Sequence, residues 1–229
     1  RALVYASERN GCWQIYQAKI KNEKEKQFAY ATDIEEEQIV NTGITSQYPQ
    51  YSPDGKEVAF FEDRATLRIV NLKNKQIRTV LDGKYNYSYS DGDIWFEWSP
   101  DSKWLLSSYI GTGGWNNTDI ALVKADGKVV HNLTNSGYSD SNGKWVLGGK
   151  AMLFASDRAG YRSHGSWGAE DDAYLMFFDL DAYNRFNMSK EEIELADANK
   201  DEKEKKEDEK KEEKQKKADE KEKKTGKIE

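Results

Sequence analysis

Short apolar or alternating runs, separated by polar turns, recur along the chain as far as about residue 189. Val58-Ala-Phe-Phe61, Leu67-Arg-Ile-Val-Asn-Leu72 and Gln76-Ile-Arg-Thr-Val-Leu81 are three such runs. Runs of this length that are rich in β-branched and aromatic residues predict short β-strands. Amphipathic stretches of about 10–15 residues do not separate them, which argues against an alternation of strands and helices. The pattern therefore predicts an all-β fold.

The runs repeat at a fixed spacing. Tyr51-Ser-Pro-Asp-Gly-Lys56 and Trp98-Ser-Pro-Asp-Ser-Lys103 are 47 residues apart, and each precedes a strand. A further step of 47 from the second strand reaches Ala151-Met-Leu-Phe-Ala-Ser-Asp-Arg158. Each unit has room for about four short antiparallel strands, and four-stranded units of about 45 residues are the blades of a β-propeller.

A fourth copy of the strand, Ala2-Leu-Val-Tyr-Ala-Ser-Glu-Arg9, precedes Glu57 by 55 residues, and the excess fits a solvated insertion in the first unit. We expect blades at about 1–45, 46–92, 93–137 and 138–189. Four blades is the lower end of the usual range of about 4–8. We therefore expect an open arc of blades rather than a closed ring, with further blades covering its ends in the native protein.

The Ser-Pro-Asp-Gly segment predicts a tight turn between two strands. Pro53 presets its own φ, and Gly55 can take a positive φ without a steric clash. Ser102 replaces this glycine in the second copy. The sequence leaves two alternatives there, a strained turn of the same type or a different turn type.

Charge separates the chain into two parts. It has 35 basic and 41 acidic residues, and this acidic balance argues against a nucleic-acid-binding protein. Residues 190–229 contain 14 Lys and 16 Asp or Glu, whereas every aromatic residue precedes them. We predict that 190–229 is a linker, either a solvated single helix or disordered. No segment has the roughly 18–20 apolar residues of a membrane-spanning helix, so we expect no membrane insertion.

Candidate catalytic chemistry is confined to Ser163, His164 and Ser166, with Asp171 and Asp172 nearby. Residues this close in sequence rarely form a triad, and the segment lacks the G-x-S-x-G motif. We predict no catalytic residue in this chain.

Neither a metal ion nor a cofactor is expected, because the two histidines are far apart and Cys12 is the single cysteine. Exposed side chains at the mouth of the propeller could contact a peptide, and the candidates are Trp115, Arg162, His164 and Trp167. Packing within the blades and hydrogen bonding in a structural loop are the alternatives for these residues.

The repeats, with the closing Asn132-Leu-Thr134, resemble the WD40-like repeats of tricorn-type propellers, which also occur in the periplasmic Tol-system protein. Two segments are more specific. The stretch from Arg162 to Phe178, and Tyr87-Ser-Tyr-Ser-Asp-Gly-Asp93, resemble the tricorn protease homologues of Bacteroidetes-type bacteria. A Lys/Glu-rich insert follows in that family, as it does here from Lys190.

This resemblance implies an exported serine peptidase in the periplasm of a Gram-negative bacterium. Its propellers admit or filter unfolded peptides, and its PDZ and peptidase domains do not lie in these residues. The implied partners are unfolded peptide or protein substrates and the remaining domains of the parent protein, which would form a homo-oligomer. Two alternatives remain, a free-standing periplasmic propeller that acts as a protein-interaction scaffold, like the Tol-system protein, and the propeller of a prolyl-oligopeptidase-type enzyme.

Overall fold

The computed structural model describes residues 2–111, 114, 116–162 and 168–200, together with residues 202, 205, 206 and 210. The chain divides into two compact units, Arg1–Phe178 and Asp179–Glu229. In the described part of the chain, every strand belongs to the first unit. None of the described helices is long and apolar enough to cross a membrane.

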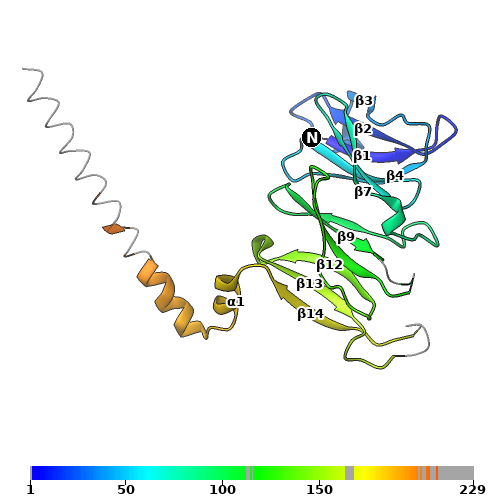
Figure 1. Ribbon diagram of the computed structural model, residues 1–229. Helices are drawn as coiled ribbons and strands as arrows, with labels where there is room; N and C mark the ends of the chain where they lie inside the picture. The colour runs from blue at the N-terminus through cyan, green and yellow to red at the C-terminus, as the bar shows by residue number, and fades with distance from the viewer. Residues whose placement is uncertain are drawn as a thin grey trace, which may run out of the picture. The chain divides into compact units, whose positions relative to one another are not determined.

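The first unit consists of four antiparallel sheets that follow one another along the chain (Figure 1). The first two sheets contain β1 (Ala2–Ser7), β2 (Gln14–Ile20) and β3 (Ile34–Gln38), then β4 (Ser46–Tyr51), β5 (Glu57–Glu62), β6 (Thr66–Asn71) and β7 (Ile77–Leu81). The last two contain β8 (Phe96–Trp98), β9 (Trp104–Tyr109), β10 (Asp119–Lys124) and β11 (Val130–Asn132), then β12 (Asp140–Val146), β13 (Ala151–Ser156) and β14 (Asp172–Phe177). Three 3-10 turns lie in the connections, η1 (Phe28–Tyr30), η2 (Gly83–Tyr85) and η3 (Leu147–Gly149).

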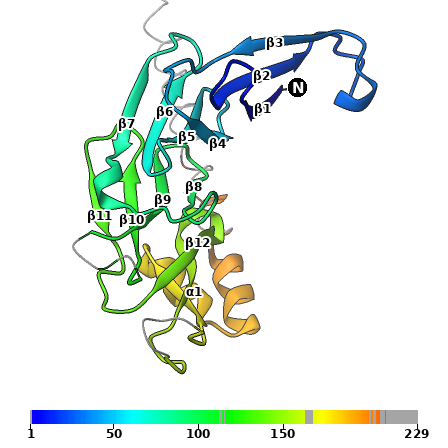
Figure 2. The same ribbon diagram turned by 90° about the vertical axis from the view of Figure 1, so that its right-hand side faces the viewer.

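Strands adjacent in sequence are neighbours in every sheet, as Figure 2 shows for β4 to β7 and β8 to β11. Such antiparallel meanders are the blades of a β-propeller, so the predicted all-β propeller fold is confirmed. The second and third sheets have the expected four strands. The first and fourth sheets have three strands each among the described residues, and for the fourth this differs from the expected four.

Equivalent backbone hydrogen bonds show which strands correspond. The N–H groups of Leu72, Ala125 and Phe178 donate to the carbonyl oxygens of Lys56, Lys103 and Lys150, at 3.0, 2.8 and 2.8 Å. The donor residues recur at equal intervals along the chain, and so do the acceptor residues. The strands β5, β9 and β13 are therefore equivalent strands of three successive units, and β1 matches them by sequence. By this alignment β6, β10 and β14 also correspond.

The two Ser-Pro-Asp turns share one conformation. Ser52 Oγ donates to Asp54 Oδ1 at 2.7 Å, and Ser99 Oγ donates to Asp101 Oδ1 at 2.6 Å. Gly55 has a φ of 70° and Ser102 a φ of 61°. The serine therefore adopts the left-handed conformation that the glycine takes more easily, which decides between the two alternatives left by the sequence.

Hydrophobic clusters join neighbouring sheets. One cluster joins the first and second sheets, the second joins the second and third, and the last joins the third and fourth. The strand β5 contributes to both of the first two clusters, and its residues Val58 and Phe61 are at most 1% exposed. The second sheet is therefore buried on both faces.

The repeated Asp/Glu-Arg ending of the strands has a structural role in the first and fourth sheets. Arg9 Nε donates to Ser7 Oγ at 3.1 Å, and its guanidinium carbon lies 4.4 Å from the ring centre of Tyr16. In the same way, the Arg158 guanidinium donates to Ser156 Oγ at 2.9 Å and lies 5.1 Å from the ring centre of Tyr174. Both arginines thus stack on an aromatic residue of the neighbouring strand.

The second unit contains α1 (Leu180–Phe186) and is helical again over residues 190–200. Asp179 caps α1 by accepting the N–H of Asp181 at 2.8 Å. Ser189 and Glu192 form a reciprocal capping box, with bonds of 2.7 and 3.2 Å between the backbone N–H of each and the side chain of the other. The first part of the charged segment is therefore a capped helix.

Candidate functional site

Of the four residues predicted to contact peptide, Arg162 is the one that lies within the described residues. Trp115, His164 and Trp167 lie outside them. Arg162 Nε is 3.2 Å from Oδ2 of the fully buried Asp157, and its guanidinium carbon is 5.0 Å from the ring centre of Tyr138. Arg162 thus neutralises a buried carboxylate, and its contact with peptide stays a prediction.

The tryptophans at the equivalent repeat positions 98 and 145 connect neighbouring sheets. Trp98 Nε1 donates to the carbonyl oxygen of Gln50 at 3.3 Å. One repeat later, Trp145 Nε1 donates to the carbonyl oxygen of Glu97 at the same distance, 3.3 Å. Each indole therefore bonds to the residue that precedes the equivalent aromatic residue of the previous sheet.

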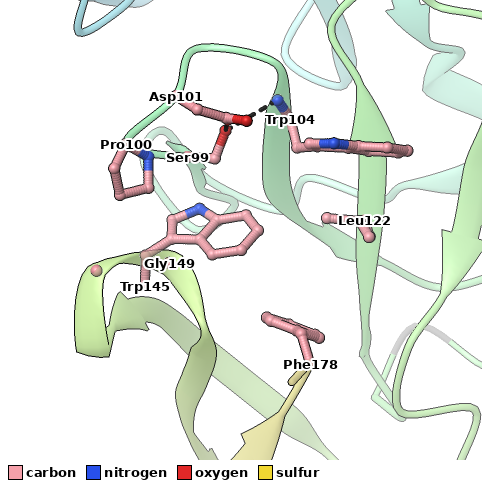
Figure 3. A pocket seen from close by; sticks show the side chains of 9 residues that line it. Ser99, Pro100, Asp101, Trp104, Leu122, Trp145, Gly149 and Phe178 are labelled. Carbon is pink, nitrogen blue, oxygen red and sulfur yellow. Dashed lines mark hydrogen bonds between the residues drawn. The ribbon is translucent and has the colours of Figure 1, made fainter. Parts of the chain in front are cut away.

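A pocket of about 590 Å³ lies between the third and fourth sheets beside Trp145. Its lining comes from both sheets: Ser99, Pro100, Asp101, Trp104 and Leu122 from the third, and Trp145, Gly148, Gly149 and Phe178 from the fourth. Figure 3 shows Trp104, Leu122, Trp145 and Phe178 around the hollow, with the Ser99-Pro100-Asp101 turn along one side. We name this hollow the aromatic pocket.

Ion pairing takes the place of aromatic residues at the preceding junction. Between the second and third sheets, the Arg78 guanidinium bonds to both Glu57 carboxylate oxygens at 2.7 and 2.6 Å. Arg78 Nε also donates to the carbonyl oxygen of Ala125 at 2.7 Å. One polar side chain thus joins two strands of its own sheet to the next sheet.

The register shows which residues replace this arrangement at the aromatic pocket. Trp104 begins β9 as Glu57 begins β5, and Phe178 follows β14 as Ala125 follows β10. His131 lies opposite Leu122 as Arg78 lies opposite Ile69. Trp104 and Phe178 thus take the positions of Glu57 and Ala125, so two aromatic rings replace one partner of the salt bridge and the acceptor across the junction. The hollow between the two rings is mainly apolar.

The chemistry of the aromatic pocket suits binding. Its rim carries the Asp101 carboxylate, whose pKa is lowered chiefly by the hydrogen bond from Ser99, so it is ionised at neutral pH. Burial opposes this shift without reversing it. In the part of the chain that the structure describes, no group of three or more His, Cys, Asp or Glu side chains could hold a metal ion. The aromatic walls can bury a bulky apolar side chain.

A second hollow, of about 780 Å³, lies between the first and second sheets. Tyr51 takes the position of Trp145 there, and its hydroxyl accepts a hydrogen bond from Gln17 Nε2 at 2.6 Å. Lys19, Lys56 and Lys73 also line it, and all three are exposed to solvent. The lining of this hollow is more polar than that of the aromatic pocket and carries one aromatic side chain, Tyr51, so the aromatic pocket is the better candidate for a binding site.

Successive antiparallel meanders joined by hydrophobic clusters define the first unit as a series of β-propeller blades. Solved structures share this fold. The tricorn protease matches with a TM-score of 0.53 and 12% identity, over 77% of this chain and 17% of its own. A protein assigned to TolB from Agrobacterium tumefaciens matches with a TM-score of 0.50 and 17% identity, over 77% of this chain and 62% of its own.

A curated protein is similar in sequence as well. The tricorn protease homolog of Saccharolobus solfataricus strain P2 is 28% identical over 123 residues, which are 53% of this chain. The chain spans 11% of the length of that relative. No protein-family model matches the chain. The similarity thus extends to tricorn protease homologues, while the likeness to their Bacteroidetes type stays a prediction.

Sequence reasoning did not find the aromatic pocket. The signal was present, because Trp104 and Trp145 occupy repeat positions that hold Glu57 and Trp98 one unit earlier. An aromatic residue at a strand start becomes informative only when the next sheet is known to face it. Phe178 ends the segment that resembles tricorn protease homologues, and the sequence alone does not indicate that it lines a pocket.

Proposed function

We propose that this chain is the non-catalytic β-propeller portion of a tricorn-like serine peptidase, where it binds unfolded peptide substrates and gates their access. The aromatic pocket carries the proposal, supported by 28% identity over 123 residues with a tricorn protease homolog. Unfolded polypeptides expose the bulky apolar side chains that folded proteins bury. An open aromatic pocket therefore favours the unfolded form.

Binding in this proposal requires no fixed sequence. An extended peptide would place one bulky side chain between Trp104 and Phe178, with Trp145 held in position by its hydrogen bond to the Glu97 carbonyl oxygen. Burial of such a side chain contributes about 1.5–3 kcal/mol. That free energy is small enough for a substrate to bind and leave repeatedly.

Peptide-bond hydrolysis is assigned to other parts of the parent protein. We propose that PDZ and peptidase domains and further blades complete it, and that it is exported to the periplasm and acts as a homo-oligomer. Cell fractionation of a bacterium that expresses the full gene tests the periplasmic location. Sedimentation analysis of the purified protein tests the oligomeric state. A cytoplasmic monomer would contradict them.

The second candidate is a free-standing propeller that binds a folded protein in the cell envelope. The fold shared with the TolB-type protein, at a TM-score of 0.50, favours it. The two functions differ in the state of the ligand, since a scaffold binds a native surface and a substrate gate binds an unfolded chain.

Fluorescence anisotropy with fluorescein-labelled casein, an unstructured polypeptide, tests the proposed function. We expect saturable binding that Trp104→Ala weakens by about 10- to 150-fold, the equivalent of 1.5–3 kcal/mol. Tyr87→Ala is the matched control, because Tyr87 is an exposed aromatic residue that does not line the pocket. Equal casein binding by wild type and Trp104→Ala would overturn the proposal.

A further inference from the structure

The fourth sheet ends at the edge strand β14, whereas in the second sheet the equivalent edge is covered by a further strand, β7. In the described part of the chain, β14 pairs with β13 alone, whereas the equivalent strand β6 pairs with both β5 and β7. The outer edge of β14 therefore presents alternate backbone N–H and C=O groups along residues 172–176. These groups can bond to a further extended backbone.

The second sheet shows how a fourth strand packs at this position. Val70 of β6 pairs with Val58 and is fully buried, and Ile77 of β7 lies beside it and packs on the cluster between the sheets. Met176 of β14 pairs with Met152 and is only half-buried. An apolar residue opposite Met176 would therefore extend the existing cluster of the third and fourth sheets, as Ile77 extends its own.

The charge along β14 distinguishes its edge from that of the first sheet. The edge strand β3 carries Glu35, Glu36 and Glu37 in succession, and charges of this kind keep other strands from pairing. In β14 the residues from Ala173 to Phe177 are all uncharged, and Leu175 is 39% exposed. Beyond Asp172 at its start, the edge strand β14 thus carries no charge that would keep another strand from pairing.

We propose that the outer edge of β14 binds an extended segment of an unstructured polypeptide as a fourth strand, with an apolar residue opposite Met176. Backbone hydrogen bonds would give the affinity, and the alternate side chains would set the preference. The segment that fits has the pattern of β7, Ile77-Arg-Thr-Val-Leu81, in which apolar residues recur beside few charges. This inference goes beyond the aromatic pocket and does not depend on it.

A peptide with the sequence of residues 74–83, labelled with fluorescein, tests the proposal on the full chain. We expect saturable binding by fluorescence anisotropy. The control peptide has proline in place of Arg78 and Thr79, because two successive prolines remove the N–H that faces β14 in either orientation. The control peptide should bind at least about tenfold more weakly, and equal binding of the two peptides would overturn the proposal.

A matched pair of variants tests whether the peptide contacts β14. Leu175→Lys lies on the edge strand and should weaken peptide binding several-fold, whereas Leu153→Lys lies on the neighbouring strand at a similar exposure, 38% against 39%, and should not. Trp104→Ala should leave the binding of this peptide unchanged. The experiment therefore distinguishes a failure of strand addition at β14 from a failure of the proposed binding in the aromatic pocket. Equal effects of the two lysine variants would contradict strand addition.

Amide hydrogen exchange followed by NMR gives the last test without a variant. Added peptide should slow exchange at alternate residues of β14, because only alternate N–H groups face outward. Protection of the same amides in a concentrated sample without peptide would show that a second copy of the chain is the occupant, and would overturn the proposal.

Discussion

The Ser102 hydroxyl oxygen accepts a hydrogen bond from the backbone N–H of Asp54 at 3.0 Å and so joins the turns of two consecutive blades. Ser102 has a φ of 61°, at the position where the preceding turn has Gly55. The left-handed conformation costs a serine about 1–2 kcal/mol, and the hydrogen bond offsets about 0.5–1.5 kcal/mol. The residue that strains its own turn therefore stabilises the junction.

Two substitutions separate these contributions. Ser102→Ala keeps the unfavourable φ and loses the hydrogen bond, so we expect the free energy of unfolding to fall by about 1 kcal/mol. Ser102→Gly loses the same bond and relieves the strain, so we expect a change within about 0.5 kcal/mol. Urea unfolding measures both, and a glycine variant as unstable as the alanine variant would refute this account.

The Glu57–Arg78 ion pair should contribute measurably to stability. Its side chains are 19% and 32% exposed, and Arg78 also bonds to the Ala125 carbonyl oxygen. Arg78→Met should lower the free energy of unfolding by about 2 kcal/mol, because it leaves a largely buried carboxylate without its partner. A double-mutant cycle with Glu57→Gln should give a coupling of about 1 kcal/mol or more.

The exposed pair Arg185–Asp197 provides the control for that experiment. Both of its side chains are about half exposed, at 50% and 52%. Arg185→Met should change stability by no more than about 0.5–1 kcal/mol. Additive effects of the Glu57 and Arg78 substitutions would show that their pairing contributes nothing.

Acid should weaken the first Ser-Pro-Asp turn. Hydrogen bonds from Ser52 and Lys56 lower the pKa of the Asp54 carboxyl to about 2. A pKa below that of the unfolded chain, about 3.9, stabilises the folded state above pH 4. This contribution is lost as the pH falls from about 4 to 2. The urea midpoint of wild type should exceed that of Asp54→Asn at pH 5 and converge with it near pH 2, and a constant difference would contradict the assignment.

The purified chain should not hydrolyse casein, because we assign catalysis to other parts of the parent protein. Release of acid-soluble peptides measures this directly. Hydrolysis by pure material that Ser166→Ala abolishes would contradict the assignment and would make Ser166 a catalytic residue.

The repeat spacing was sufficient to predict the fold. A displacement of 47 residues between Ser52 and Ser99 implies equivalent turns, and the structure gives both turns the same hydrogen bonds. The conformation of Ser102 could not be deduced in this way. Its positive φ is compensated by a contact with Asp54 in the neighbouring blade, and a local pattern does not contain that contact.

The aromatic pocket could not be predicted because it depends on two sheets at once. Trp104 and Phe178 are far apart in sequence, and the local pattern around each residue predicts no contact between them. Trp104 and Phe178 are recognised as pocket residues only by comparison with Glu57 and Ala125, which occupy the equivalent positions at the preceding junction. This comparison requires the strand register at both junctions. The ion pair of Arg162 with the buried Asp157 could not be deduced from the sequence either, and the contact of Arg162 with peptide stays a prediction.

Each hydrophobic cluster joins only two neighbouring sheets. The stability of the first unit is therefore a sum over nearest neighbours, as in a one-dimensional stack. The second and third sheets are each held by two clusters, whereas the first and fourth are each held by one. Local unfolding should therefore begin at the first and fourth sheets and proceed to the second and third. The amide protons of β13 and β14 should exchange before those of β5. The strand edge that we propose as a binding surface thus lies on a sheet that can open without disturbing the two central ones.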